Sequence, residues 1–445
     1  MERRKNSISV SDGNPAIVKD PKKCVECGHC RAVCAEEINV AGHGIVGREG
    51  EKFCIHCGQC AAACPEEAIR VKSEVEMVRD AVKDPEKIVI FSTSPSVRVG
   101  IGDEFLEKPG VFSEGKMVSA LRSLGADYVL DVTFSADLTI MEEGSELLQR
   151  ILKQGVLPQF TSCCPAWVKY VETYHPDLIP HLSSAKSPIG MQGAMIKTYF
   201  AAIHRLDPKK IVSVAVTPCT AKKFEIRRPE LADAGAYLGI EGMRDNDHVI
   251  TTKELVAWMK EENIEFQRLP EGNFDPILGK GSGAGVIFGN TGGVMEAALR
   301  MAYECLTGES PTDQLLHFEP VRGLQGIKEA EVEINGLKIK TAVVYGTANA
   351  EKLLTGGHLS EYHFVEVMTC PGGCISGAGQ PQHHEIPPTN RIRMSRMASM
   401  YKEDASMTLR NSIDNPEIGK IYKDFLGEPL GTRSEQLLHT SYYKR

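Results

Sequence analysis

The chain has 445 residues, a formal net charge of -8, 42% hydrophobic residues and 25% charged residues. This length exceeds what one compact core of ordinary size requires, so two or three domains are expected. The acidic balance argues against a nucleic-acid-binding protein, and the sequence has no apolar run of the roughly 18 residues that a membrane span needs.

Fourteen cysteines are grouped instead of being spread along the chain. Eight lie in two repeated runs near the N-terminus, five lie in three short motifs, and Cys305 stands alone. This grouping is typical of thiolates that bind metal in a reducing compartment, not of the disulfide framework of a secreted protein. The basic first residues are followed by no apolar segment of a signal peptide, so we expect a cytoplasmic protein.

Residues 1–80 begin with a polar tail or turn of about 20 residues and contain the one internal repeat. A Cys-x2-Cys-x2-Cys-x3-Cys run recurs thirty residues later, and a short predicted strand follows each run, at 38–40 and 68–71. Three cysteines of such a run can bind one 4Fe-4S cubane, while the fourth reaches the other cluster. A zinc site is disfavoured because zinc does not need a third cysteine at this spacing. One predicted set is Cys24, Cys27, Cys30 and Cys64, and the other is Cys54, Cys57, Cys60 and Cys34.

The rest of the chain alternates between predicted strands and helices, after a linking helix at 73–83. This order is typical of α/β folds, in which chemistry collects at the carboxyl ends of strands. An Asn335-Gly336 pair marks a hairpin turn between residues 317 and 346. The predicted strands are 88–91, 128–132, a short strand leading into Thr161, 211–216, 285–288 and 364–368. The predicted helices are 117–124, 135–154, 188–204, 252–261 and 291–305.

Three cysteine motifs each follow a predicted strand. They contain the adjacent pair Cys163 and Cys164, then Cys219, then Cys370 and Cys374. Adjacent cysteines cannot both ligate one small cluster comfortably, so one of the pair is expected to complete a four-thiolate set with the other three. The thiol left over is a candidate proton carrier, because its pKa is close to working pH. Taken singly, each motif could also be a structural cysteine beside a turn.

Together and in this order, the motifs resemble the signature motifs of the iron-only (FeFe) hydrogenases. The catalytic H-cluster of that family is a 4Fe-4S cubane bridged by a cysteine to a diiron unit that carries CO, cyanide and a bridging dithiolate. The resemblance implies that Cys163 transfers protons and that Cys374 also forms the bridge. It assigns the cubane to Cys164, Cys219, Cys370 and Cys374.

The resemblance also implies a domain order. A small α+β ferredoxin-like domain with two 4Fe-4S clusters is expected over residues 1–80, since this part resembles bacterial two-cluster ferredoxins. An α/β H-cluster domain of two lobes, with mixed sheets flanked by helices, is expected over residues 81–386. Residues 387–445 have weak helical segments at 394–401 and 418–425 and resemble the hydrogenase small subunit, here as a fused C-terminal belt. Disorder is the alternative for this polar tail.

Three further side chains are implied to face the diiron unit. Ser96 lies in a turn of small residues after the strand at 88–91, where an ordinary strand-to-helix turn is the alternative. Lys222 follows Cys219 by three residues, which is the spacing of one helical face, although an exposed lysine is the alternative. The resemblance casts Ser96 and Lys222 as cyanide-binding donors and Met368 as packing on the diiron bridge.

Glu143, Glu146 and Arg150 recur at three and four residues, so they share one face of the helix predicted at 135–154. Most such stripes are solvated surfaces. The resemblance implies a proton path that runs through Cys163, Glu143, Ser183, Glu146 and Arg150.

Four positions depart from the pattern of the family. Thr217 stands in place of a methionine, Ile189 of a glutamine, Ser94 of an alanine and Ala378 of a glycine. We expect the first three to alter packing near the diiron unit, so catalytic bias and sensitivity to oxygen or CO do not carry over from the family.

The leading hypothesis is a hydrogenase that interconverts H2 with protons and electrons. Alternatives are a non-catalytic iron-sulfur assembly factor and an H2 sensor of the same superfamily. Having no flavin or nucleotide motif, the chain is expected to pass electrons to ferredoxin or to iron-sulfur partner subunits, with a formate dehydrogenase complex for CO2 reduction as one option. Maturation proteins are expected to insert the diiron unit.

Overall fold

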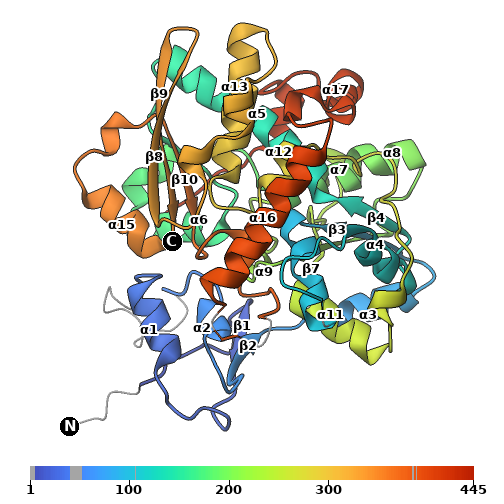
Figure 1. Cartoon of the computed structure of the whole chain (residues 1–445). Coiled ribbons are helices and arrows are strands. Elements are labelled where there is room, and N and C mark those ends of the chain that lie inside the picture. The colour runs from blue at the N-terminus through green and yellow to red at the C-terminus, as the bar shows by residue number, and fades with distance from the viewer. Residues whose placement is uncertain (1–5, 41–52, 106, 383–384, 387) are drawn as a thin grey trace.

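The computed structural model describes residues 6–40, 53–105, 107–382, 385–386 and 388–445. The N-terminal part lies beneath two lobes, and helix α16 (Asn390–Ser406) runs across the front between their sheets (Figure 1). Within the described ranges, no helix is both long enough and apolar enough to cross a membrane.

The described residues of the N-terminal part form one two-stranded sheet and two short helices. Strand β1 (Ile17–Lys19) pairs antiparallel with β2 (Ile69–Val71), and α1 (His29–Glu36) and α2 (Gln59–Ala62) carry cysteines of the two runs. The predicted strand at 68–71 is therefore confirmed, but its partner lies in the stretch expected to be a tail or turn. The strand predicted at 38–40 is wrong. Ile38 and Val40 are buried against side chains of a lobe, so they pack between regions instead of joining a sheet.

The first lobe is built on a parallel sheet in the order β4-β3-β6-β7. Its central strands have apolar runs on both faces, as expected for a sheet covered by helices on each side. Helices α3 (Val75–Lys83), α4 (Glu114–Ser123) and α11 (Thr252–Glu261) cover one face, and α5 (Val132–Leu152) packs on the other. The strands are β3 (Ile88–Thr93), β4 (Tyr128–Asp131), β6 (Ile211–Thr217) and β7 (His248–Thr251).

The second lobe has a mixed sheet in the order β5-β10-β9-β8. Strand β10 is parallel to its neighbours, whereas β8 and β9 are antiparallel and joined by Asn335 and Gly336, both with positive φ. Positive φ at both central residues is the geometry that favours an Asn-Gly turn. Helices α6 (Pro165–Tyr174) and α15 (Thr347–Thr355) cover one face, and α13 (Gly293–Thr307) the other. The strands are β5 (Gln159–Phe160), β8 (Ile327–Ile334), β9 (Leu337–Tyr345) and β10 (Phe364–Met368).

The segment predicted as a strand at 285–288 is instead a helix, α12 (Gly283–Ile287). A short buried apolar run does not distinguish a strand from a buried helix by periodicity. Here Ser282 caps the helix by accepting from the amide of Gly285, and its own hydroxyl donates to Asp137 at 2.6 Å. A Cβ at Gly285 would lie 2.5 Å from the carbonyl oxygen of Thr133, so glycine lets α12 press against α5.

The helix predicted at 188–204 is interrupted. It consists of α7 (Pro188–Met195), a π-helical turn at Ile196–Phe200 and α8 (Ala201–His204). The other predicted helices of the lobes are present with small shifts of their ends.

The C-terminal belt is ordered, which excludes the alternative of a disordered tail for its described residues. It consists of α16, α17 (Pro416–Ile421), a π-helical turn at Tyr422–Leu426 and α18 (Thr432–Leu438). Its last residue, Arg445, hydrogen-bonds through its backbone amide to the carbonyl of Glu172 on α6.

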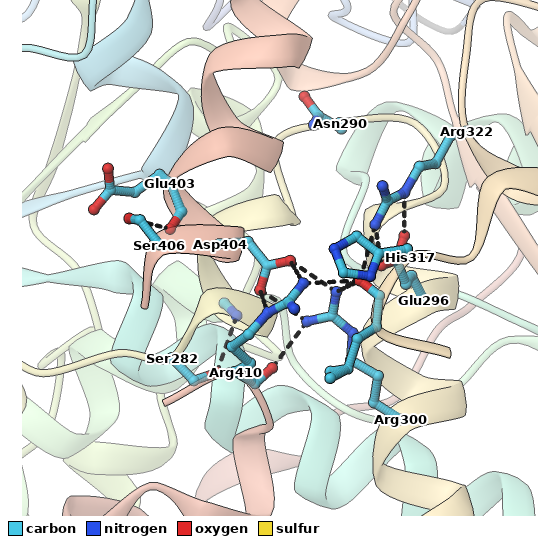
Figure 2. Close-up of polar contacts among 12 residues, drawn as sticks. Ser282, Asn290, Glu296, Arg300, His317, Arg322, Glu403, Asp404, Ser406 and Arg410 are labelled. Atoms are coloured by element: carbon cyan, nitrogen blue, oxygen red, sulfur yellow. Dashed lines mark hydrogen bonds and ion pairs between the residues drawn. The ribbon is translucent and has the colours of Figure 1, made fainter. Parts of the chain in front are cut away.

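Buried ion pairs attach α16 to the second lobe. Figure 2 shows the guanidinium of Arg300 between Glu296 and Asp404, with N–O distances of 2.6 and 2.9 Å. Burial alone would raise the pKa of Asp404, but hydrogen bonds from Arg300 and Arg410 outweigh it and lower that pKa. All three groups of the Arg300 cluster are fully buried, so the loss of one would leave an uncompensated charge inside the protein.

Candidate active site and cluster sites

The ligand motifs meet between the two lobes because each follows the carboxyl end of a parallel strand. Strands β5, β6 and β10 lead into the three cysteine motifs, and β3 leads into the turn that carries Ser96. These ends surround a cavity of about 80 Å³. Eight of the residues predicted from the motifs line it: Ser96, Cys163, Cys164, Cys219, Lys222, Met368, Cys370 and Cys374.

Four of the thiols that line this cavity lie near enough to one another for their charges to interact. Burial, and next the charge of the Cys164 thiolate, raises the pKa of Cys219 to about 12. Burial, and next the charges of the Cys219 and Cys164 thiolates, also raises the pKa values of Cys370 and Cys374. Such thiols become thiolates only when a positive group lies among them, so the donor set fits an iron-sulfur cubane.

Cys164 has its own partner on the third motif. The amide of Thr369 donates to Cys164 Sγ at 3.5 Å, and the thiol donates to Thr369 Oγ1 at 3.4 Å. This ties the first motif to the strand end that carries Cys370. Thr369 also lines the cavity, although nothing in its spacing singled it out.

Cys163 faces a different neighbour, Glu143 of α5. Burial, and next the charge of Glu143, raises the pKa of the Cys163 thiol well above its ordinary value, so the expectation of a thiol pKa close to working pH is wrong for this environment. Burial, and next the charge of Glu146, raises the pKa of Glu143 to about 8. Neither carboxyl oxygen of Glu143 has a hydrogen-bond partner within normal distance among the described residues. A buried carboxyl of this kind is protonated at neutral pH and is free to give or accept a proton.

A polar chain continues from Glu143 toward the surface. The hydroxyl of Ser183 donates to Glu146 Oε2 at 2.8 Å, and Arg150 Nη2 donates to Glu146 Oε1 at 2.6 Å. The hydroxyl of Ser183 also lies near enough to Glu143 to lower that pKa in part. Glu143 and Glu146 are buried, so the alternative of a solvated charge stripe is wrong.

Lys222 is also buried, which excludes the alternative of an exposed lysine. Its ammonium donates to the backbone carbonyl of Cys163 at 3.0 Å and to Glu225 Oε2 at 2.8 Å. Burial alone would lower the pKa of Lys222, but the charge of Glu225, the charges of the thiols of Cys219 and Cys163 and the hydrogen bond to Glu225 together outweigh burial, so the pKa is raised. Glu225 was not among the predicted site residues, although its spacing of three from Lys222 could have suggested the pair.

The family departures Ser94, Ile189 and Thr217 all line the cavity. Phe288 and Gly289 line it as well, although the predicted strand at 285–288 does not indicate this, because that segment is the helix α12. Gly373 is required by space, since a Cβ there would lie 2.6 Å from the amide nitrogen of Thr291, and its φ is +100°. The tight backbone brings the third motif against α12.

The two N-terminal cysteine sets each surround a cavity of their own. Within the part of the chain that the structure describes, no three ligand side chains converge closely enough for a single metal ion. Wider rings of thiols suit a cluster of several irons. Cys34, Cys54, Cys57 and Cys60 line a cavity of about 40 Å³, and Cys24, Cys27, Cys30 and Cys64 line one of about 10 Å³.

The set around Cys57 lies against the active site. The hydroxyl of Thr220 donates to the carbonyl of His56 at 2.8 Å, and Gln59 Nε2 donates to the carbonyl of Ser376 at 3.2 Å. A Cβ at Gly58 would lie 2.5 Å from Thr220 Oγ1, so glycine permits this close approach. The other set reaches the surface, where Cys27 is exposed.

Comparisons with known proteins agree with this arrangement. Residues 87–378 match the model of the iron-only hydrogenase large subunit, C-terminal domain. The chain belongs to the iron-only hydrogenase family. Residues 16–80 match a 4Fe-4S dicluster domain, and residues 390–445 match the iron hydrogenase small subunit.

Individual hydrogenases are similar over nearly the whole chain. Iron hydrogenase 1 of Clostridium pasteurianum is 44% identical over 98% of this chain and 77% of its own length. The NADP-reducing hydrogenase subunit HndD of Solidesulfovibrio fructosivorans is 43% identical over 100% of this chain and 77% of its own length. A structure of a variant of FeFe-hydrogenase HydA1 from Chlamydomonas reinhardtii has a TM-score of 0.72 and 39% identity, covering 84% of this chain and 99% of that one.

These findings confirm the predicted hydrogenase class, the α/β fold with its ferredoxin-like N-terminal part, the 4Fe-4S clusters and the H-cluster. The assembly-factor alternative is weaker. Cytosolic iron-sulfur assembly component 3 of Bos taurus is 31% identical over 82% of this chain and 76% of its own length.

Proposed function

We propose that this hydrogenase interconverts H2 with protons and electrons in the cavity between the lobes, using Cys163 as the thiol that exchanges the proton. The observation that carries this proposal is the order of polar groups behind Cys163. This order leads from the cavity toward the surface through Glu143, Ser183, Glu146 and Arg150. The hydroxyl oxygen of Ser183 lies 2.8 Å from Glu146 Oε2, and Arg150 pairs with Glu146. A thiol used only for ligation has no need of such a chain.

In this proposal, the residues divide the work by their contacts. Cys164, Cys219, Cys370 and Cys374 would hold the cubane, and Cys374 would also connect it to the diiron unit. The H-cluster, when bound, supplies the redox chemistry of H2. Ser96 and Lys222 would donate hydrogen bonds toward the cyanide ligands, and Met368 would pack on the diiron unit, since all three line the cavity. The pair with Glu225 keeps Lys222 charged and aimed at the cavity.

Proton transfer then passes between neighbouring side chains. In H2 formation, the thiol of Cys163 would give its proton to the hydrogen that forms at the site, and the thiolate left behind would take a proton from Glu143, which is protonated at neutral pH because its pKa is about 8. In H2 oxidation, both transfers would run in the opposite direction. Ser183 relays a proton from Glu146 to Glu143. Arg150 hydrogen-bonds Glu146 and holds it at the outer end of the path.

Electrons are proposed to leave through the two N-terminal clusters, first through the one held by Cys34, Cys54, Cys57 and Cys60 and then through the one held by Cys24, Cys27, Cys30 and Cys64. The exposed Cys27 supports this order. The small-subunit match and the similarity to HndD support iron-sulfur partner subunits. The specific electron partner we propose is either free ferredoxin or iron-sulfur subunits, for which a formate dehydrogenase complex is one option. Maturation proteins are the proposed source of the diiron unit.

We propose the same three domains as the motifs imply, 1–80, 81–386 and 387–445. We also propose a cytoplasmic location, which is supported by fourteen cysteines of which none is paired in a disulfide.

Anaerobic co-expression with maturation proteins tests this function. The expected result is H2 evolution with a reduced dye, together with infrared bands of metal-bound CO and cyanide. Cubanes without those bands, and no H2 turnover despite maturation of a control hydrogenase, would favour the assembly-factor alternative. Bands without turnover would favour a sensor.

A further inference from the structure

A lysine from the active-site helix reaches toward a ligand of the neighbouring cluster. Lys169 lies on α6, five residues after Cys164, and is 7% exposed. Its ammonium lies 4.6 Å from the centroid of the Phe224 ring and 2.7 Å from His56 Nε2. His56 lies between Cys54 and Cys57 in the sequence and is 2% exposed.

The chemistry of the two groups sets the direction of their hydrogen bond. An ammonium has donors only, so His56 Nε2 must accept and the ring proton must lie on Nδ1. His56 Nδ1 is 3.3 Å from Oδ1 of Asn14, to which it therefore donates.

Asn14 links His56 to the sulfur of Cys54 by hydrogen bonds of the same direction. Its Oδ1 also accepts from the amides of Ala16 and Ile17 at 2.9 and 3.2 Å, which fixes the orientation of the side-chain amide. Its Nδ2 consequently faces Cys54 Sγ and donates to it at 3.6 Å. The backbone amide of His56 donates to the same sulfur at 3.4 Å.

We propose that Lys169, His56 and Asn14 form a hydrogen-bonded relay that raises the reduction potential of the cluster bound by Cys54. Each hydrogen bond of the relay is donated in the direction of the Cys54 sulfur, and the relay begins at the buried ammonium of Lys169. Hydrogen bonds to the sulfurs and nearby charge are among the factors that set the potential of a 4Fe-4S cluster. Positive charge and N–H groups favour the more negative, reduced form.

The position of the relay gives it a role in the enzyme. The loop that carries His56 also contacts Thr220, which is next to Cys219, so the affected cluster is the one nearest the active site. A higher reduction potential at this cluster favours the state in which the electron is on this cluster, beside the active site, over the state in which it is on the cluster at the surface. The inference rests on the proposed ligand sets, because it takes Cys54 as a ligand.

Redox titration followed by electron paramagnetic resonance tests the relay on full-length protein prepared without the diiron unit. Lys169→Met removes the cation, and His56→Leu removes the middle of the relay without a change of charge. For each, we expect about a tenfold fall in the ratio of reduced to oxidised cluster at fixed potential, which is about 59 mV for a one-electron couple. The cluster bound by Cys24 should not shift. Lys169→Arg, which keeps the cation and its donors, should stay near the unsubstituted value.

Lys72→Met is the matched control, because Lys72 donates at 3.4 Å to the backbone carbonyl of Asn14 and stands outside the relay. It should leave the potential near its original value. The double variant Lys169→Met with His56→Leu should shift no further than the larger single shift, since both break one chain. Additive shifts, or an equal shift in Lys72→Met, would overturn the relay. Iron analysis of the unsubstituted protein distinguishes a failure of the proposed ligand sets from a failure of the relay. Missing clusters would count against the ligand sets. Intact clusters with unchanged reduction potentials in the variants would count against the relay alone.

Discussion

Ser183 donates a hydrogen bond of 2.8 Å to Glu146, across 37 residues of sequence. The contact joins the segment before α7 to the buried face of α5, where Glu143 lies between Glu146 and the active-site cavity. Two acidic groups and one hydroxyl therefore lie together inside an apolar core, with a hydrogen bond of normal length between Ser183 and Glu146 and none to the carboxyl of Glu143 among the described residues.

Removal of the Ser183 hydroxyl should interrupt proton transfer and leave the clusters in place. We expect Ser183→Ala to lower H2 turnover by at least about 100-fold, the usual cost of a lost acid or base step. Ser184→Ala is the matched control, because its hydroxyl contacts His439 at 2.8 Å and only its backbone amide contacts Glu146. Turnover assays with infrared spectra of both variants check this. Equal losses in the two would count against a specific path.

The buried carboxyl of Glu143 should make stability depend on pH. Its pKa is raised from 4.5 to about 8, so between these values the folded state binds a proton that the unfolded state has lost. Stability contributed by this group is therefore full below pH 4.5 and lost as pH rises to 8. At about 1.4 kcal/mol per pKa unit, the loss amounts to a few kcal/mol.

Glu143→Gln should consequently unfold at a higher temperature than the unsubstituted protein at pH 8 and show little difference near pH 5. Thermal unfolding at several pH values measures this. Glu309→Gln, at an exposed glutamate, controls for the change in net charge. A gap between Glu143→Gln and the unsubstituted protein that does not widen from pH 5 to pH 8 would contradict the assigned burial of the charge.

The ion pairs of Figure 2 should contribute to the attachment of the belt. Arg300→Met leaves Glu296 and Asp404 buried without their shared partner, so we expect a loss of about 3–5 kcal/mol in the free energy of unfolding. Arg268→Met breaks the exposed pair with Glu265 and should cost less than about 1 kcal/mol. Chemical denaturation of both variants decides between them, and similar losses would argue against a structural role for the buried cluster.

Iron analysis tests the three ligand sets together. Protein reconstituted without maturation proteins should bind about twelve iron atoms, four in each of three cubanes. Cys305→Ser should leave this number unchanged, since Cys305 lies outside every set. About eight irons in the unsubstituted protein would remove one of the sets.

Cysteine spacing and apolar runs predicted much of this structure because both signals are local. The run Ile88 to Phe91 is long and apolar enough to identify a buried strand. The Asn335-Gly336 pair directly identifies the turn between β8 and β9. The motifs follow strand ends, and parallel strands bring such ends to one edge, so the cavity could be expected before its shape was known.

Other features depend on contacts that no local pattern records. The helix α12 is short and glycine-rich, and what makes it a helix is the distant anchor between Ser282 and Asp137. Strand β1 has three residues and acquires its partner about 50 residues later. The contact between Lys169 and His56 spans 113 residues, so neither residue could be assigned to a site from its own neighbours.

The assignment of the adjacent cysteines is the centre of this account, and the infrared spectrum of Cys163→Ala after full maturation tests it most directly. Cys163 faces Glu143, whereas Cys164 faces Thr369 and the other three thiols. We predict that Cys163→Ala keeps the bands of metal-bound CO and cyanide while H2 turnover falls by at least about 100-fold. Cys164→Ala should lose those bands together with cubane iron. Loss of the bands in Cys163→Ala with their retention in Cys164→Ala, or full turnover in Cys163→Ala, would contradict the account.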